Sequence, residues 1–133
     1  MIPYRIVLAD NHALLRQGLK RILREKPEIE VIGEAGDGTE LLNLLSLSKL
    51  APHMVILDPS MPDLRGIEAI RKVKSAHPDV KILILSMYKD KEYLSRAISN
   101  GAEGYLLKEA VDKELLPAIE MIMQGGIYVS PFP

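Results

Sequence analysis

Short apolar runs alternate along this chain with segments in which apolar residues recur every three or four positions. The runs are rich in β-branched residues with one exception, which is typical of buried β-strands, and they cover residues 5–9, 29–33, 54–57, 81–85 and 104–107. The segments between and after them place apolar residues on one side of a helix. These helical positions are Leu15, Leu19 and Ile22; Leu41, Leu44 and Leu45; Ile67, Ile70 and Val73; Leu94, Ala97 and Ile98; and Leu115, Ile119 and Ile122.

Strict alternation of strands and helices predicts right-handed crossovers and a parallel sheet covered by helices on both faces. We therefore expect an α/β domain with a five-stranded, doubly wound parallel sheet. Polar residues mark the helix ends. We expect an Asp37–Glu40 capping box, N-caps at Asp63, Asp90 and Asp112, and a C-cap at Asn100-Gly101.

Composition narrows the class of protein. A length of 133 residues predicts one domain, and 47% hydrophobic and 26% charged residues with a net charge of −1 predict a soluble globular protein. This charge gives the segment no means of binding nucleic acid directly. The chain has no cysteine, which excludes disulfides and thiolate metal sites. No apolar stretch resembles a signal peptide or a membrane span, so we expect a cytoplasmic location and no membrane contact.

Polar side chains follow four of the five predicted strands, at the point where each strand ends. Asp10 follows the first strand, Asp58 the third, Ser86 the fourth and Lys108 the fifth. The carboxyl ends of these strands meet at one edge of such a sheet, where open α/β proteins bind ligands. Asp58 could instead cap the next helix, but that helix is expected to begin near Arg65, where Asp63 is better placed.

The four residues predict metal-assisted handling of a phosphoryl group. Carboxylate and carbonyl oxygens are ligands that Mg²⁺ prefers, and a lysine and a hydroxyl suit an anion. No glycine-rich phosphate loop follows the first strand, which argues against nucleotide or flavin binding. We therefore expect the Asp58 carboxylate to accept the phosphoryl group itself, forming an acyl phosphate. His12 is interpreted as a bystander, because a lone histidine lacks metal-ligand spacing.

Several linked motifs in this order resemble the receiver domain of two-component response regulators, over essentially the whole chain. Further stretches resemble the NarL/FixJ type, in which a receiver precedes a LuxR-type helix-turn-helix output domain. The resemblance implies a flavodoxin-like (βα)5 fold with strand order 2-1-3-4-5. The residues that carry it are 8–12, 33–38, 57–62, Ser86, 104–110 and 125–131.

The resemblance also implies roles for individual residues. Asp58 would accept a phosphoryl group from a sensor histidine kinase, and Lys108 and Ser86 would bind its oxygens. Tyr105 would be the aromatic switch residue, turning inward when Ser86 moves toward the phosphate, although it could simply fill the strand edge. Asp10, Asn11, Asp58 and the carbonyl of Ser60 would hold Mg²⁺.

Two positions depart from the usual receiver pattern. Asn11 stands where most receivers carry a second acid, so the site has one negative charge fewer. Pro59 directly follows the acceptor, removes a backbone N–H and restricts Asp58 to extended angles. These departures are compatible with an ordinary working receiver and with one tuned to weak or phosphorylation-independent signalling.

Three functions remain open at this point. The first is a phosphoacceptor switch that catalyses only its own phosphorylation and dephosphorylation, associates as a homodimer when phosphorylated and controls transcription. The second is a degenerate receiver that serves as an interaction module, and the third is an enzyme such as an aspartyl-phosphate phosphatase. We expect residues 1–125 to form the receiver and 126–133 to begin a linker to an absent DNA-binding domain.

Overall fold

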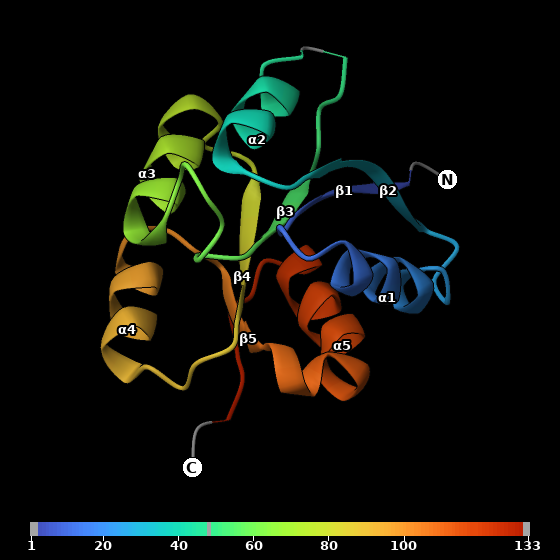
Figure 1. Cartoon of the computed structure of the whole chain (residues 1–133). Helices are drawn as coiled ribbons and strands as arrows, with labels where there is room; N and C mark the ends of the chain where they lie inside the picture. The colour runs from blue at the N-terminus through green and yellow to red at the C-terminus, as the bar shows by residue number, and fades with distance from the viewer. Residues whose placement is uncertain (1–2, 48, 132–133) are drawn as a thin grey trace.

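The structure, a computed structural model that describes residues 3–47 and 49–131, contains one parallel sheet with helices on both faces (Figure 1). Its strand order is β2-β1-β3-β4-β5-β6. The strands are β1 (Tyr4–Ala9), β2 (Ile29–Ala35), β3 (Met54–Leu57), β4 (Lys81–Ser86), β5 (Gly104–Leu107) and β6 (Tyr128–Val129). The helices are α1 (Ala13–Leu23), α2 (Gly38–Leu45), α3 (Gly66–Ala76), α4 (Lys91–Ser99), the short 3-10 helix η1 (Lys108–Ala110) and α5 (Val111–Met123).

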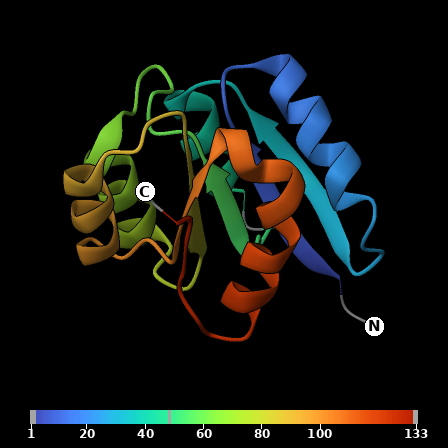
Figure 2. The ribbon, with the colours of Figure 1, turned by 90° about the horizontal axis from the view of Figure 1, so that it is seen from below.

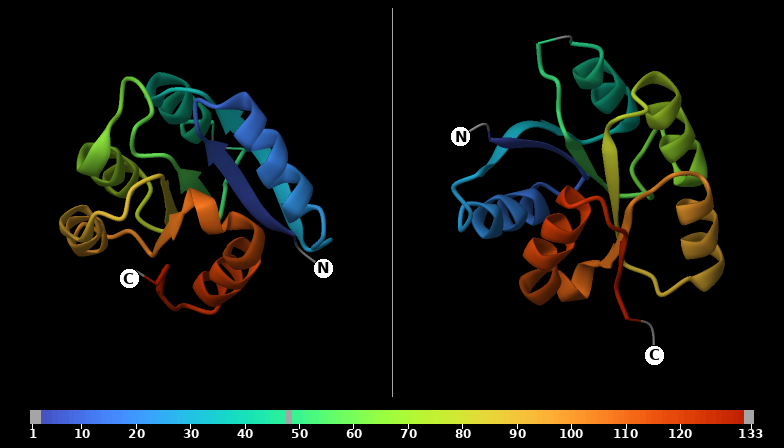
Figure 3. Two further views of the ribbon diagram at one scale, coloured as in Figure 1. Left: turned by 60° about the horizontal axis from the view of Figure 1, so that its bottom comes forward. Right: turned by 180° about the vertical axis from the view of Figure 1, so that it is seen from behind.

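The helices divide between the two faces of the sheet. Helices α1 and α5 cover one face and lie side by side, as Figure 2 shows, while α2, α3 and α4 cover the other (Figure 3). Side chains of β3 alternate between two buried clusters: Met54 and Ile56 pack under α1 and α5, and Val55 and Leu57 pack under the other three helices. The short apolar run at 54–57 is therefore a central strand buried on both faces.

The predicted fold is confirmed, with one addition at the edge. Strands β1 to β5 have the expected parallel pairing and order. A sixth, two-residue strand, β6, pairs with β5 in the segment expected to begin a linker. The backbone N–H of Ser130 donates to the Tyr105 carbonyl at 2.8 Å, and the Ser130 hydroxyl accepts from the Leu107 N–H at 3.1 Å. Two residues are too few to show alternation, so this strand gave no signal in the sequence. The predicted boundary at residue 125 stays a prediction.

Three of the predicted helix caps are confirmed. The Asp37 and Asp90 side chains accept hydrogen bonds from the third residue of their helices, Glu40 and Tyr93, as expected for N-caps. Gly101 adopts the left-handed conformation with φ of 107° after α4, which confirms the predicted C-cap.

Two predicted caps are wrong. Helix α5 follows η1 without a break, so Asp112 lies inside its first turn, and Ala110 occupies the N-cap position. Asp63 adopts a left-handed conformation with φ of 70° in the loop before α3, and Arg65 occupies the N-cap position there. Asp58 is therefore also not a cap of α3.

Within the described residues, no helix combines the length and apolar character that crossing a membrane requires.

Candidate functional site

Pairing of β1 with β3 brings the two acids of the site together. Ala9 lies opposite Leu57, and the backbone N–H of Asp58 donates to the Ala9 carbonyl at 2.9 Å. Asp10 and Asp58 therefore follow neighbouring strand ends, and each is only 2% exposed. Because burial removes water from both carboxylates, their charges must be balanced locally.

Lys108 supplies the nearest positive charge. It begins η1 directly after β5, and its Nζ lies 3.0 Å from Asp10 Oδ2 and 3.1 Å from Asp58 Oδ2. One ammonium between two carboxylates leaves a net charge of −1, which favours a further cation. Asp10 Oδ2 is buried and, apart from this ion pair, has no hydrogen-bond partner among the described residues. The donor set therefore fits a hard divalent cation such as Mg²⁺.

The second oxygen of Asp58 is held by the next turn. Asp58 Oδ1 accepts hydrogen bonds from the Ser60 backbone N–H at 2.9 Å and from the Ser60 hydroxyl at 2.8 Å. An Asp carboxylate that accepts a hydrogen bond from the backbone N–H two residues later forms an Asx-turn. The middle residue of this turn does not donate its backbone N–H, so Pro59, which has none, fits that position. Asp58 is thus fixed by Ser60 on one oxygen and faces Lys108 with the other. The role of the Ser60 carbonyl as a metal ligand stays a prediction.

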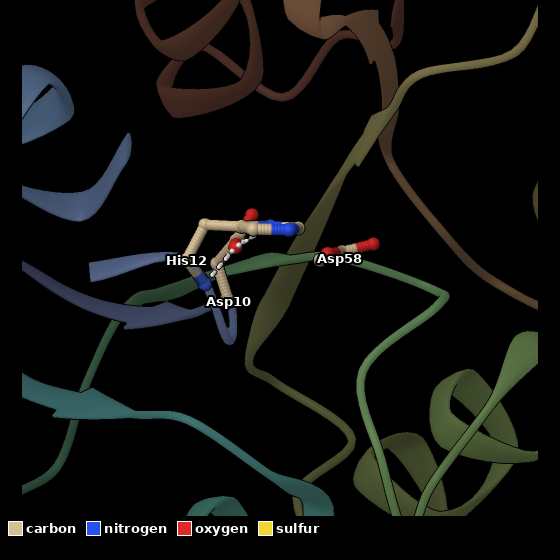
Figure 4. Close-up of side chains that lie close together, drawn as sticks. All are labelled: Asp10, His12 and Asp58. Atoms are coloured by element: carbon tan, nitrogen blue, oxygen red, sulfur yellow. Dashed lines mark hydrogen bonds and ion pairs between the residues drawn. The ribbon is translucent and has the colours of Figure 1, made fainter. Parts of the chain in front are cut away.

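His12, interpreted from the sequence as a bystander, contacts the site. Its backbone N–H donates to Asp10 Oδ1 at 2.8 Å, and its ring Nδ1 lies 3.1 Å from the same oxygen. One ligand atom each from Asp10, His12 and Asp58 lie within 4.8 Å of one another (Figure 4). The signal that could have found His12 is its spacing: two positions after Asp10, it closes an Asx-turn on that carboxylate. Asn11 is exposed, and its role toward a metal stays a prediction.

Arg16 on α1 also contacts the site and was missed in the sequence. Its guanidinium donates to the Asp10 carbonyl, and its Nε donates to Glu34 Oε1 at 3.0 Å. Lys20 Nζ lies 2.8 Å from the other oxygen of Glu34. Hydrogen bonds from Lys20, and then Arg16, lower the pKa of Glu34. This network ties α1 to the backbone of the acid at the end of β1.

Ser86 and Tyr105 are linked through the backbone of Tyr88. The Ser86 hydroxyl accepts from the Tyr88 N–H at 3.0 Å and lies 3.3 Å from the Tyr88 carbonyl, which also accepts from the Tyr105 hydroxyl at 3.0 Å. Ser86 is 3% exposed and Tyr105 is fully buried, so the ring faces inward, and burial raises the pKa of its phenol. Both side chains line a cavity of about 210 Å³ together with Pro59, Ser60, Gly66, Tyr88, Asp90 and Tyr93.

The fold, and the acids and lysine at the carboxyl edge of its sheet, define the class of protein. The family model of the response regulator receiver domain matches residues 6–120, from β1 into α5. The chain belongs to the response regulator receiver domain family.

Relatives of this chain are longer regulators. It is 40% identical over 127 residues to the transcriptional regulatory protein DegU of Brevibacillus brevis, and this match covers 96% of this chain and 53% of DegU. It is 41% identical over 128 residues to the oxygen regulatory protein NreC of Staphylococcus carnosus, covering 96% and 58%. The chain thus spans little more than half the length of these relatives.

Solved structures agree with the fold. The non-phosphorylated receiver domain of RcsB from Escherichia coli has a TM-score of 0.90 at 29% identity, covering 97% of this chain and 99% of that one. A LuxR-family two-component response regulator from Aurantimonas sp. SI85-9A1 has a TM-score of 0.89 at 33% identity, covering 97% and 91%. The resemblance to receivers with LuxR-type output is confirmed.

Proposed function

We propose that this domain is a phosphorylation switch in which Asp58 accepts a phosphoryl group from a sensor histidine kinase. The observation that carries the proposal is the position of Lys108, whose Nζ lies 3.0 and 3.1 Å from the carboxylates of Asp10 and Asp58. A buried acid pair with one lysine at a sheet edge is suited to binding another anion only when a further cation is present.

The proposed reaction is a transfer between two side chains. An oxygen of Asp58 attacks phosphorus, the bond from phosphorus to the kinase histidine nitrogen breaks, and an acyl phosphate and a free histidine result. Asp58 Oδ2 faces Lys108, whereas Oδ1 is held by Ser60, so we assign the attack to Oδ2. The domain would act only on itself, in phosphorylation and in the later hydrolysis of its acyl phosphate.

We assign the metal to Mg²⁺, held by Asp10, Asn11, Asp58 and the Ser60 carbonyl. When bound, it would offset the charge of the incoming phosphoryl group. Lys108 would bind one phosphoryl oxygen, and the Ser86 hydroxyl would leave the Tyr88 backbone to bind another. Because Tyr105 bonds the same Tyr88 carbonyl, movement of Ser86 would reach β5 and the neighbouring surface of α4 and α5.

The proposed output is control of transcription by a longer protein. DegU is a transcriptional regulatory protein, and RcsB has been seen as dimers bound to DNA. We propose that phosphorylation favours a homodimer of this domain, and that DNA is bound only by a separate C-terminal domain. A two-fold dimer would match two-fold DNA sites.

A second candidate function is a degenerate receiver that binds partners without phosphorylation. Asn11 is the observation that favours it, because a neutral amide replaces a carboxylate in the expected metal site. A phosphatase is the third alternative, and it predicts turnover of added phosphomonoesters.

One experiment separates the first two of these functions. The protein is incubated with Mg²⁺ and a small acyl-phosphate donor, and its intact mass is measured. We expect a gain of one phosphoryl group that is lost in Asp58→Asn and kept in the control Asp63→Asn, which changes an exposed acid in the following loop. A gain that persists in Asp58→Asn contradicts the assignment, and no gain in the parent protein favours the degenerate receiver.

A further inference from the structure

We infer that His12 is a metal ligand of this site, and that the site therefore binds a d-block cation such as Zn²⁺ or Co²⁺ through an imidazole nitrogen as well as oxygens. The inference deepens the metal site of the proposed function. It concerns which cations the protein takes, and it does not require that Asp58 be phosphorylated.

The contacts of Asp10 carry the first step. The backbone N–H of His12 fixes Asp10 Oδ1 at 2.8 Å, and this same turn brings the imidazole Nδ1 to 3.1 Å from that oxygen. In Figure 4 the ring extends from the end of β1 toward Asp58. The backbone turn therefore places residue 12 beside Asp10, and the imidazole of His12 contacts the same carboxylate.

The second step concerns the size of the site. Ligand atoms of Asp10, His12 and Asp58 lie within 4.8 Å of one another. Two ligands of one tetrahedral Zn²⁺ ion, each about 2.0–2.2 Å from it, lie about 3.3–3.6 Å apart. The widest pair of the group must therefore close by roughly 1–1.5 Å, and the His12 side chain, which is 56% exposed, has room to move.

The third step concerns competing charge. Lys108 approaches the Oδ2 atoms of both acids, whereas His12 lies at Oδ1 of Asp10. The lysine and the imidazole thus occupy different sides of Asp10, and a cation can meet His12 without displacing Lys108 from both acids. Apart from its ion pair with Lys108, Asp10 Oδ2 has no hydrogen-bond partner among the described residues, and one lysine serves two acids, so the pair retains capacity for a further cation.

The chemistry of the ligands gives the selectivity. Mg²⁺ prefers oxygen ligands, whereas imidazole suits Zn²⁺, Co²⁺ and other d-block ions. With Asn11 in place of a carboxylate, the oxygen ligands carry less charge and bind every divalent cation less tightly. A nitrogen ligand from His12 then adds affinity for d-block ions and almost none for Mg²⁺.

Affinities of the metal-free, untagged protein for Mg²⁺ and Zn²⁺ are measured by calorimetry, and Co²⁺ is followed by its visible absorption. Zn²⁺ and Co²⁺ affinity should fall at least about tenfold in His12→Gln, because even groups that only support ligands change metal affinity by about 10- to 100-fold. Mg²⁺ affinity should change less than about twofold. His77→Ala, a change in the turn after α3, is the matched histidine control and should leave all three affinities unchanged.

The pattern across metals decides the outcome. Equal losses of Mg²⁺ and Zn²⁺ affinity would mean that His12 only positions Asp10, and unchanged Zn²⁺ affinity would remove it from the site; either result overturns the inference. Zn²⁺ affinity should also fall in Asp58→Asn, and its persistence would place the ion elsewhere. Phosphorylation in the presence of Mg²⁺ is measured separately, by intact mass. A protein that is never phosphorylated would contradict the proposed function, but it would not affect the conclusion on His12 as a metal ligand.

Discussion

The Nζ atom of Lys108 lies 3.1 Å from Oδ2 of Asp58, although 50 positions separate the two residues in the chain. Asp58 follows the central strand β3, and Lys108 follows β5, two strands along in the sheet order. The same ammonium lies 3.0 Å from Asp10 Oδ2. One lysine thus pairs with two buried acids, which makes the stability of the fold depend on it.

We expect Lys108→Met to lower the free energy of unfolding. Removal of one partner from a buried ion pair costs about 3–5 kcal/mol, because the remaining charge is left buried without compensation. Here the side chain of Lys108 is 12% exposed at the rim of the sheet, so we expect the lower end, about 3 kcal/mol. Urea denaturation of the metal-free protein measures it.

The control for this variant is Lys72→Met on the exposed face of α3. Lys72 pairs with Glu68 at 3.4 Å, but the two side chains are 53% and 67% exposed. A surface pair of this kind contributes less than about 1 kcal/mol. Equal effects of the two substitutions would show that Lys108 does not balance the acid pair.

Much of this arrangement could be predicted from the sequence, because it depends on local patterns. The apolar run at Met54–Leu57 identifies a strand buried on both faces, and the acid after it falls at the ligand-binding edge by the topology of parallel sheets. The same reasoning placed Lys108, Ser86 and Asp10 together.

The features that the sequence did not predict depend on contacts between elements. Arg16 reaches the Asp10 carbonyl only because α1 packs beside β1, and no spacing rule encodes that distance. Asp112 has a capping residue's chemistry, but the preceding 3-10 helix runs directly into α5 and moves the helix start to Val111. Strand β6 depends on hydrogen bonds to Tyr105 and Leu107 that no two-residue pattern indicates.

A second prediction concerns charge at the metal site. Asn11→Asp should tighten Mg²⁺ binding on the order of tenfold, since a unit charge near a divalent cation contributes about 1–2 kcal/mol even in water. Phosphorylation should become faster with it. Calorimetric titration measures the affinity, and Asn43→Asp on the exposed side of α2 is the matched control. Equal Mg²⁺ affinity in parent and variant would show that position 11 does not face the metal.

A third prediction concerns the loop that carries Asp58 into α3. Gly38 begins α2, its N–H donates to the Pro62 carbonyl at 2.7 Å, and an added Cβ would lie 2.1 Å from the Leu64 Cβ. Gly38→Ala should therefore lower the free energy of unfolding by about 1–3 kcal/mol through overpacking. Gly18→Ala on α1, where a Cβ meets nothing within 4 Å, should instead stabilise by about 0.5–1 kcal/mol. The opposite signs of the two effects are read from denaturation midpoints. A neutral Gly38→Ala would contradict the packing argument.

A fourth prediction concerns acid stability. Lys20 and Arg16 lower the pKa of Glu34 in the folded protein. Their contribution is therefore present above the ordinary carboxyl pKa of about 4.3 and is lost as pH falls through the lower, folded-state pKa. Glu34→Gln should be less stable than the parent at pH 7, and the difference should vanish in acid. Thermal unfolding from pH 7 to pH 3 measures this, with Glu30→Gln, an exposed position on the same strand, as control. A pH-independent difference would mean that packing, not charge, is responsible.

The last prediction concerns transmission from the phosphoacceptor to the surface. Ser86 and Tyr105 hydrogen-bond the same residue, Tyr88. Under the proposed function, the hydroxyl of Ser86 would therefore connect a phosphoryl group on Asp58 to the ring on β5. Ser86→Ala removes that hydroxyl while leaving Asp58 and Lys108 in place. We expect the variant to gain a phosphoryl group from the small donor but to lose the donor-induced self-association of the parent.

Sedimentation with and without donor measures the association, and intact mass confirms that both proteins carry the label. Ser75→Ala, at an exposed position on α3, is the matched serine control and should associate like the parent. Identical donor-induced association in Ser86→Ala and the parent would show that the signal reaches the surface by another route. Tyr105→Phe then tests the hydroxyl of Tyr105, since it keeps the ring and removes the bonds that this hydroxyl makes, including the one to the Tyr88 carbonyl. Association in this variant would show that the signal does not need the Tyr105 hydroxyl.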